Sequence, residues 1–451
     1  MIDRTIRLTT GGLLFLALIV GGSAQAIWGN FALLLVALVV LGLIVCAPPT
    51  DAPRLQGRLP LIGSAFAALL IFQLIPLPPG LWAELPGRAM IARGFDLLHM
   101  PRPWLPWSLS PADSLVAMLS LVVPLAVFAG VVREPRKRPF LLIAALGSGT
   151  LRGVLLGFLQ VRDGGGDQWY LYRFSAFGQA SGFFANSNHM GSLLLANIPF
   201  VSALAADQFG NRSDISQRGL VIGSAVGLSI ILIFAIALNH SLAVLMLGGP
   251  VILLSLTVPP WRDPRIRKAL GAVAIIALFG AVALGAYQGR FSPGGKQSSL
   301  ETRSLIWTTS AEAVDDFAMT GAGLGTFPKL YPHYEAPDQV DATFINHAHN
   351  DLLEYVVELG LPGLLLVVAF LIWWVRRVRG AWRPGEGNVY ARAASIASGA
   401  IMLHSLVDFP LRTAAIAAVF SLSVGLLVLR IPLVRSDGRK ELRDPRHLAI
   451  D

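Results

Sequence analysis

The chain has 451 residues, of which 54% are hydrophobic and only 14% are charged, and its formal net charge is +9. Soluble proteins carry about 25% charged residues, so the composition excludes a soluble globular protein and indicates a polytopic membrane protein. The single cysteine, Cys46, excludes an intramolecular disulfide.

Twelve apolar stretches are long enough, at about 1.5 Å per residue, to cross about 30 Å of hydrocarbon. We therefore expect an all-α bundle of about 12 transmembrane helices. The predicted spans are 9–27, 30–47, 59–77, 112–132, 139–160, 187–206, 219–238, 241–258, 268–286, 361–376, 391–409 and 412–430. The first stretch also fits a signal peptide, because Ala24-Gln25-Ala26 resembles a cleavage site; we expect an uncleaved span.

Lysine and arginine are distributed unevenly between the two sets of predicted loops. With the N-terminus in the cytoplasm, 25 of the 36 basic residues fall on the inner loops and tails, and ten fall on the outer loops. Positively charged loops are retained in the cytoplasm. We therefore expect both termini to be cytoplasmic. Most of the positive charge is then a topology signal, and no nucleic-acid ligand is expected.

The outer loop before the sixth predicted span contains the run Gly182-Phe-Phe-Ala-Asn-Ser-Asn188. Asn186 and Asn188 are suited to cap the incoming helix. Alternatively, that helix N-terminus forms an anion site together with Arg173, because the amide groups of a helix start favour negative charge. His189 is interpreted as an interfacial residue without a chemical role.

The longest polar interval, residues 287–360, separates the ninth and tenth predicted spans and is net acidic. It contains Arg303, whose planar guanidinium is suited to grip a phosphate in two places. A salt bridge with the nearby Glu301 is the structural alternative for this arginine.

The same interval contains His347 and His349 within the run Phe344-Ile-Asn-His-Ala-His-Asn-Asp-Leu-Leu-Glu-Tyr355. A histidine accepts a proton near neutral pH, and Asn350 and Asp351 are placed to orient His349 or to cap the next helix. In an extended backbone the two histidines share a face, which leaves a metal site as an alternative, although no second ligand motif of recognisable spacing is present.

Three further features lie in or beside apolar stretches. The spacing of Glu354 and Glu358 among leucines and valines predicts an amphipathic helix at the membrane interface. Arg152 lies within the fifth span, where a charge is costly and indicates either function or pairing inside the bundle. His404 and Asp408 are one helical turn apart, as either a proton-handling pair or a helix lock.

Several motifs occur in a characteristic order on the predicted outer face. They are the Gly-Phe-Phe-x-Asn-x-Asn run, Glu301-Thr-Arg-Ser-Leu-Ile-Trp307, Gly321-Ala-Gly-Leu-Gly325, His349-Asn-Asp-Leu-Leu-Glu-Tyr355 and Glu358-Leu-Gly-Leu-Pro-Gly363. In this order, over roughly residues 150–430, the chain resembles the O-antigen ligase and polymerase family. The N-terminal third carries no motif that matches.

The resemblance implies a GT-C-like membrane glycosyltransferase of the bacterial inner membrane, which needs no bound metal or nucleotide. It would move a glycan from a polyprenyl-diphosphate carrier to a glycan, lipid A core or protein acceptor on the periplasmic face. The matching motif positions assign catalytic roles to His349, Arg303 and Arg173. As substrate-binding residues we expect Asn186, Asn188, Asn350, Arg152 and His404.

The expected organisation is a group of N-terminal transmembrane helices at 1–150, a ligase-like domain at 151–430 and a basic cytoplasmic tail at 431–451. The competing interpretation is a multi-span transporter of an anionic solute, because an intramembrane arginine and a His/Asp pair also suit a substrate path. Transporters often carry broken helices in matching positions of two halves, and no such repeat is evident. Convergence of Arg173, Arg303 and His349 at the outer face would favour the enzyme.

Overall fold

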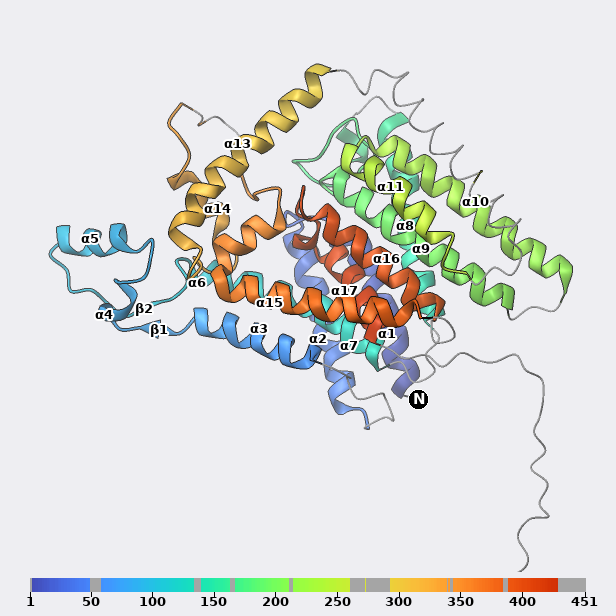
Figure 1. The fold of residues 1–451 in the computed structure, drawn as a ribbon, viewed down its shortest axis with the longest axis horizontal. Coiled ribbons are helices and arrows are strands. Elements are labelled where there is room, and N and C mark those ends of the chain that lie inside the picture. Colours follow the sequence, from blue (N-terminus) through green and yellow to red (C-terminus); the bar gives the residue numbers. More distant parts are fainter. Residues whose placement is uncertain are drawn as a thin grey trace, which may run out of the picture.

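The computed structural model describes residues 2–48, 58–133, 139–162, 167–210, 214–259, 272, 293–338, 340, 344–383 and 388–428. The described chain is almost entirely helical (Figure 1), and six of its helices are long and apolar enough to cross a membrane. Shorter apolar helices accompany them. The predicted fold class, a polytopic helical membrane protein, is therefore confirmed.

The described elements are helices, apart from the two short strands β1 and β2. The helices of the bundle are α1 (Ile2–Val20), α2 (Ile27–Cys46), α3 (Leu59–Gln73), α6 (Pro111–Ser120), α7 (Val122–Val132), α8 (Phe140–Arg162), α9 (Ser187–Gly210), α10 (Ile215–Asn239), α11 (Leu242–Ser255), α15 (Asp351–Ala381), α16 (Val389–His404) and α17 (Ala414–Val428). The remaining elements are β1 (Pro76–Leu77), α4 (Pro79–Trp82), α5 (Ala89–Leu97), β2 (Leu105–Pro106), η1 (Asp167–Trp169), α13 (Pro293–Phe317), α14 (Phe327–Leu330), η2 (Tyr331–His333) and η3 (Pro410–Arg412).

Most predicted spans coincide closely with one helix. The first is displaced, since α1 begins at Ile2 and ends at Val20 instead of covering 9–27. Two others differ for clear backbone reasons. The stretch 112–132 is divided into α6 and α7 because Pro124 cannot donate a hydrogen bond to the carbonyl of Ser120. The tenth span is the second part of α15, which bends at Gly360 with a φ of 58°. The predicted ninth span and the basic tail lie outside the described residues, apart from residue 272.

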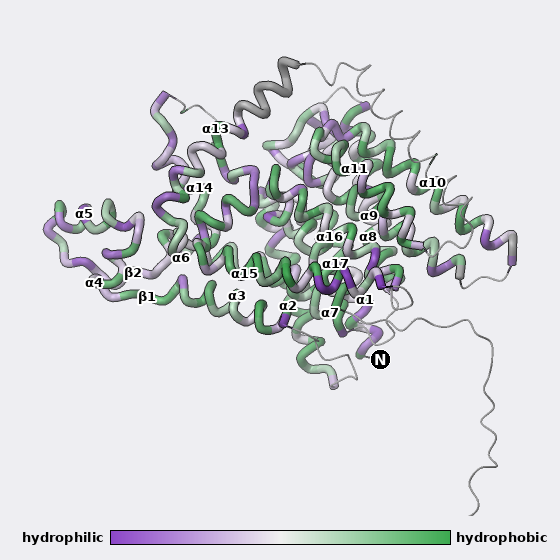
Figure 2. The backbone as a smooth tube through the Cα atoms, in the orientation of Figure 1, coloured by the Kyte–Doolittle hydropathy of each residue, from purple (hydrophilic) through white to green (hydrophobic). Residues whose placement is uncertain are grey.

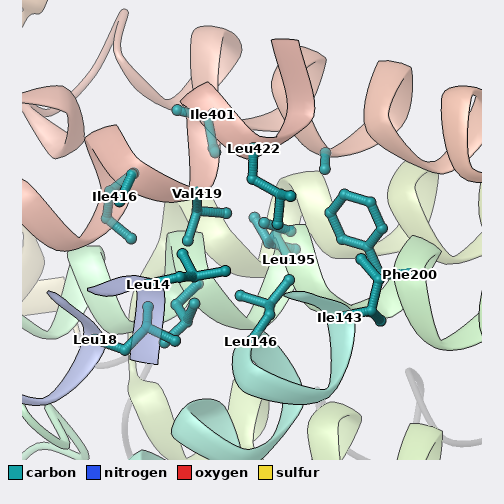
Figure 3. Close-up of a cluster of buried hydrophobic side chains, with 14 of the residues drawn as sticks. Leu14, Leu18, Ile143, Leu146, Leu195, Phe200, Ile401, Ile416, Val419 and Leu422 are labelled. Carbon is teal, nitrogen blue, oxygen red and sulfur yellow. The ribbon is translucent and has the colours of Figure 1, made fainter. Parts of the chain in front are cut away.

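The core of the bundle is formed by apolar side chains from nine helices, namely α1, α2, α7, α8, α9, α10, α11, α16 and α17. Figure 3 shows Leu14 and Leu18 of α1 and Leu146 of α8 packed with residues of α9, α16 and α17. Helix α9 is the most buried of the six long apolar helices. Figure 2 shows that the bundle is predominantly hydrophobic, as lipid contact requires. Because α9 and α16 pack against one another in this core, the start of α9 lies beside the end of α16.

A second, smaller core lies outside the bundle and fixes the polar interval between α13 and α15. Ile306 and Phe317 of α13 pack with Phe327, Tyr331 and Val357. The glycine loop 321–325 follows α13 and lies directly against the bend of α15. A Cβ on Gly321, whose φ is 75°, would come within 2.4 Å of the carbonyl oxygen of Glu358, so this close approach requires glycine.

Candidate active site

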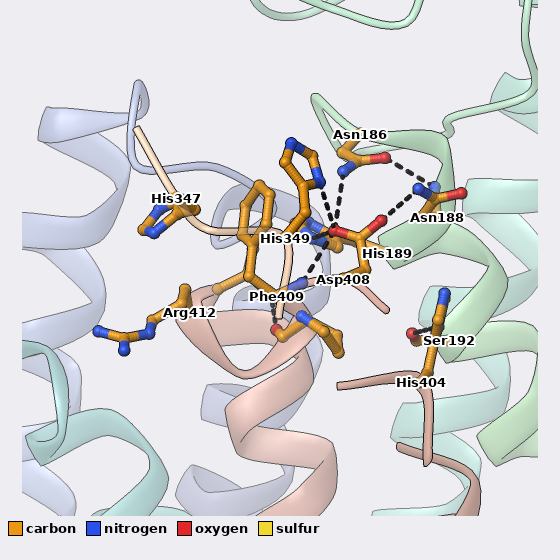
Figure 4. A network of polar contacts seen from close by, with 12 residues as sticks. Asn186, Asn188, His189, Ser192, His347, His349, His404, Asp408, Phe409 and Arg412 are labelled. Carbon is orange, nitrogen blue, oxygen red and sulfur yellow. Dashed lines mark hydrogen bonds and ion pairs between the residues drawn. The ribbon is translucent and has the colours of Figure 1, made fainter. Parts of the chain in front are cut away.

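Asp408 is the centre of a polar cluster at one end of the bundle, where α9 and α15 begin and α16 ends. Its carboxylate is fully buried, and Figure 4 shows Asn186, Asn188, His189 and His349 directed toward it. Its neighbours are Asn186 at 3.5 Å, Asn188, His189 at 3.7 Å, Arg303 at 3.4 Å and His349 at 3.4 Å. The backbone N–H of Phe409 donates to the same carboxylate over 2.8 Å.

The asparagines are presented by a segment that is tied to the bundle through buried amides. Gln160 of α8 accepts hydrogen bonds from the backbone of Ser181 and Gly182, and Asn239 donates to the carbonyls of Ala180 and Ser187. Hydrogen bonds from buried side-chain amides hold this backbone in place. The start of α9 therefore has one fixed position relative to Asp408.

His349 has a φ of 49°, a left-handed conformation that non-glycine residues rarely adopt. The backbone is held on both sides of it. Asn350 caps α15 by accepting from the N–H of Leu353 over 3.1 Å, and Glu354 reaches back to accept from Ala348 N–H and pairs with His347 Nδ1. Backbone strain persists where the surrounding contacts determine it and is concentrated at functional sites.

Phe409 separates this cluster from a second group of charges. The centroid of its ring lies 4.3 Å from the ring centroid of His347, 4.9 Å from that of His189 and 4.8 Å from that of His349. Figure 4 shows His347 and Arg412 on one side of Phe409, with Asp408 and the asparagines on the other.

Arg412 is the cation of the second group and is surrounded by carboxylates from the first turns of α15. Its guanidinium lies 3.5 Å from Asp351, 3.4 Å from Glu354 and 2.9 Å from Glu358, and it stacks over Tyr355 at 4.8 Å. Burial lowers the pKa of Arg412, but the carboxylates outweigh this effect and raise it well above its ordinary value. The guanidinium therefore stays charged.

The charge state of Asp408 follows from its surroundings. Burial alone raises the pKa of this carboxyl, but the adjacent His189 and His349 outweigh burial and hold the pKa well below its ordinary value. Asp408 is therefore ionised near neutral pH. A buried carboxylate in contact with a histidine orients the ring and stabilises it when it takes up a proton.

The structure brings some of the predicted site residues together and leaves others apart. Arg303, His349, Asn186 and Asn188 surround Asp408, and Asn350 caps the helix beside them. The ring of His404 contacts Ser192 over 2.6 Å, and the backbone carbonyl of His404 accepts from the N–H of Asp408.

The other two predicted arginines are exposed. Arg173 lies over Phe174 and Arg152 over Phe15, with 5.5 Å and 5.2 Å to the ring centroids. In the described part of the chain no contact joins either arginine to Asp408. The side chain of Glu301 lies outside the described part.

Two interpretations of the sequence differ from the structure. His189, interpreted as interfacial, is 2% exposed and faces Asp408. The acidic side of the helix 351–359 is buried rather than interfacial, because Glu354 and Glu358 pair with Arg412. The sequence did contain one indication that Asp408 and Arg412 belong to the site: both are charged residues in a five-residue turn between two apolar stretches.

Among the residues that the structure describes, no three acidic, histidine or cysteine side chains are arranged to hold a metal ion.

The helical fold and this polar cluster define a multi-span membrane protein with a built site at one end of its bundle. Residues 226–368, which include Arg303 and His349, match the family model described as O-antigen ligase. The chain is also similar to the exopolysaccharide production protein ExoQ of Rhizobium meliloti (strain 1021), with 27% identity over 206 residues. That match covers 42% of this chain and 45% of the relative, so it spans less than half of either protein. The matches confirm the resemblance to the O-antigen ligase and polymerase family.

Proposed function

We propose that the chain is a membrane glycosyltransferase that moves a glycan from a polyprenyl-diphosphate carrier to an acceptor hydroxyl, as a ligase or polymerase of surface polysaccharide. The observation that carries this proposal is the grouping of Arg303, His349 and two asparagines around the buried Asp408. The similarity to O-antigen ligase over residues 226–368 supports it.

His349 acts as the general base in this proposal. Its Nδ1 faces Asp408 at 3.4 Å, which leaves Nε2 to take the proton of the acceptor hydroxyl. The acceptor oxygen then forms a bond to the anomeric carbon of the glycan, and the bond from that carbon to the carrier phosphate breaks. The polyprenyl diphosphate leaves with the electron pair of the broken bond.

Arg303 stabilises the leaving diphosphate. Its side chain is 22% exposed, so an arriving anion is able to reach the guanidinium, while Asp408 at 3.4 Å fixes its direction. Fixed cations aimed at developing negative charge are among the most effective catalytic groups. The amide groups of Asn186 and Asn188 and the start of α9 supply further hydrogen-bond donors. No step in this scheme requires a metal ion or a nucleotide.

The site is placed on the periplasmic face of the bacterial inner membrane, with both termini in the cytoplasm. The distribution of lysine and arginine supports this orientation, because the turn with Asp408 then lies opposite the basic inner loops. The acceptor is a glycan, a lipid A core or a protein. Asp408 lies beyond the end of α16 rather than within it, which favours an enzyme over a transporter with a binding site near the bilayer midplane.

Replacement of Arg303 by lysine tests the proposed function. Lysine keeps the charge but loses the forked geometry that grips a phosphate in two places, so Arg303→Lys should lose most transfer activity while the protein inserts normally. The measurement is the amount of transferred glycan, normalised to protein in the membrane fraction. A fully active lysine variant would reduce Arg303 to a general electrostatic role.

A further inference from the structure

Glu354 of α15 is a fully buried carboxylate whose two oxygens contact different groups. Its Oε1 pairs with His347 Nδ1 at 2.9 Å and with the guanidinium of Arg412 at 3.4 Å. Its Oε2 accepts a hydrogen bond from the backbone N–H of Ala348 over 3.0 Å. A buried carboxylate needs a cation such as Arg412, but that ion pair uses Oε1. The bond from Oε2 to the backbone therefore has a consequence of its own.

This backbone bond spans His349. In a capping box, an acidic side chain of the first helical turn reaches back to the N–H of the N-cap residue. The N-cap of α15 is Asn350, and Glu354 reaches two residues further back, to Ala348. His349 therefore lies inside a loop of chain that the side chain of Glu354 closes. Its φ of 49° is a conformation that an L-residue leaves unless its neighbours are fixed.

The direction of the His349 ring depends on this backbone conformation. On the far side of His349, the N–H of Asp351 donates to the carbonyl of Ser405 over 2.8 Å, which ties the helix start to the end of α16. With both sides fixed, His349 Nδ1 lies 3.4 Å from Asp408. Release of Ala348 would allow the φ of His349 to return to a negative value and would turn the ring away from the carboxylate.

We propose that Glu354 is a positioning residue for glycan transfer, which keeps His349 in its left-handed conformation and so directs the ring at Asp408. This inference rests on the proposed function, because it takes His349 as the base. It gives Glu354 a different part from Glu358, which pairs with the same guanidinium but accepts from the N–H of Gly325 in the glycine loop.

Three substitutions separate the backbone bond from the ion pair. Glu354→Leu removes both. Glu354→Gln removes the negative charge beside Arg412 but keeps an oxygen that is able to accept from the N–H of Ala348. Glu358→Leu is the matched control for the charge, because it removes a carboxylate from Arg412 and leaves the bond to Ala348 in place.

The first measurement is steady-state transfer by the two Glu354 variants, normalised to folded protein. A small misplacement of a catalytic group costs about 10² in rate, so we expect kcat of Glu354→Leu to fall about 10²-fold while KM for the lipid-linked donor changes little. Glu354→Gln should keep most of the wild-type kcat. Equal losses of kcat in the two variants would overturn the inference, because the charge beside Arg412 would then be the property that matters.

The second measurement is hydrogen–deuterium exchange of the full-length protein in nanodiscs, which needs no turnover. The amide of Ala348 is followed by mass spectrometry in peptides that cover residues 345–352. We expect it to exchange about tenfold faster in Glu354→Leu, as for the loss of one hydrogen bond, and near the wild-type rate in Glu354→Gln and Glu358→Leu.

Two exchange results would overturn the inference. Wild-type exchange in Glu354→Leu would mean that the carboxylate does not fix the backbone at Ala348, and equally fast exchange in Glu358→Leu would assign the effect to the charge around Arg412. A wild-type protein without transfer activity would contradict the proposed function, whereas the exchange rates decide the role of Glu354 in either case.

Discussion

Replacement of His349 by alanine is expected to nearly abolish glycan transfer while the protein accumulates at its normal level. General-base catalysis contributes about 10² to 10⁴ in rate, and the His349 ring lies 3.4 Å from the buried carboxylate that would stabilise it when protonated. The measurement is initial transfer rate by purified protein, with abundance in the membrane fraction determined in parallel.

The matched control for this experiment is His347→Ala. His347 is two residues away and pairs with Glu354 rather than Asp408, so its replacement should reduce the rate less. The base assignment is wrong if His349→Ala transfers glycan at the wild-type rate. It is also wrong if the two alanine variants lose activity equally, since that result would point to a shared structural role.

Replacement of Arg412 by methionine is expected to produce the largest loss of stability. Methionine has a similar length but no charge, so Asp351, Glu354 and Glu358, each 3% exposed or less, would be left without their cation. Removing one partner of a buried ion pair typically costs about 3–5 kcal/mol. Thermal unfolding of the detergent-solubilised protein, monitored by size-exclusion chromatography after heating, should show a large fall in Tm.

Arg152→Met is the control for the same measurement. Arg152 is an exposed arginine that lies over Phe15 and makes a local hydrogen bond to the carbonyl of Ser148. Its replacement removes the same charge without leaving a buried carboxylate unpaired, so Tm should change little. An Arg412→Met variant as stable as Arg152→Met would show that the carboxylates of α15 do not depend on Arg412.

The bundle was predictable from the sequence because lipid imposes a length and a composition on every spanning helix. The division at Leu121 follows from Pro124, a local signal that hydropathy alone passes over. The kink at Gly360 was harder to predict, since it depends on a close approach by the loop at Gly321. Such approaches are tertiary, and hydropathy carries no record of them.

The candidate site was predictable where polar residues formed motifs in the outer segments, as for Arg303, His349 and the two asparagines. Asp408 was noted only as a neighbour of His404, because its partner Asn188 is 220 residues away in the chain. The buried face of Glu354 and Glu358 could not be predicted for a similar reason. Without knowledge that Arg412 packs against them, two glutamates on an amphipathic helix indicate a solvated face.

The central claim is most directly tested by reconstitution with a defined donor. Purified protein in nanodiscs would be given a polyprenyl-diphosphate-linked glycan and a second lipid-linked glycan as acceptor, with a metal chelator present and no nucleotide. The measurement is release of polyprenyl diphosphate together with formation of the extended glycan. We expect both products in equal amounts, at a rate that the chelator does not change. Absence of diphosphate release, or a reversible stop on addition of the chelator, would contradict the proposed metal-independent glycosyl transfer.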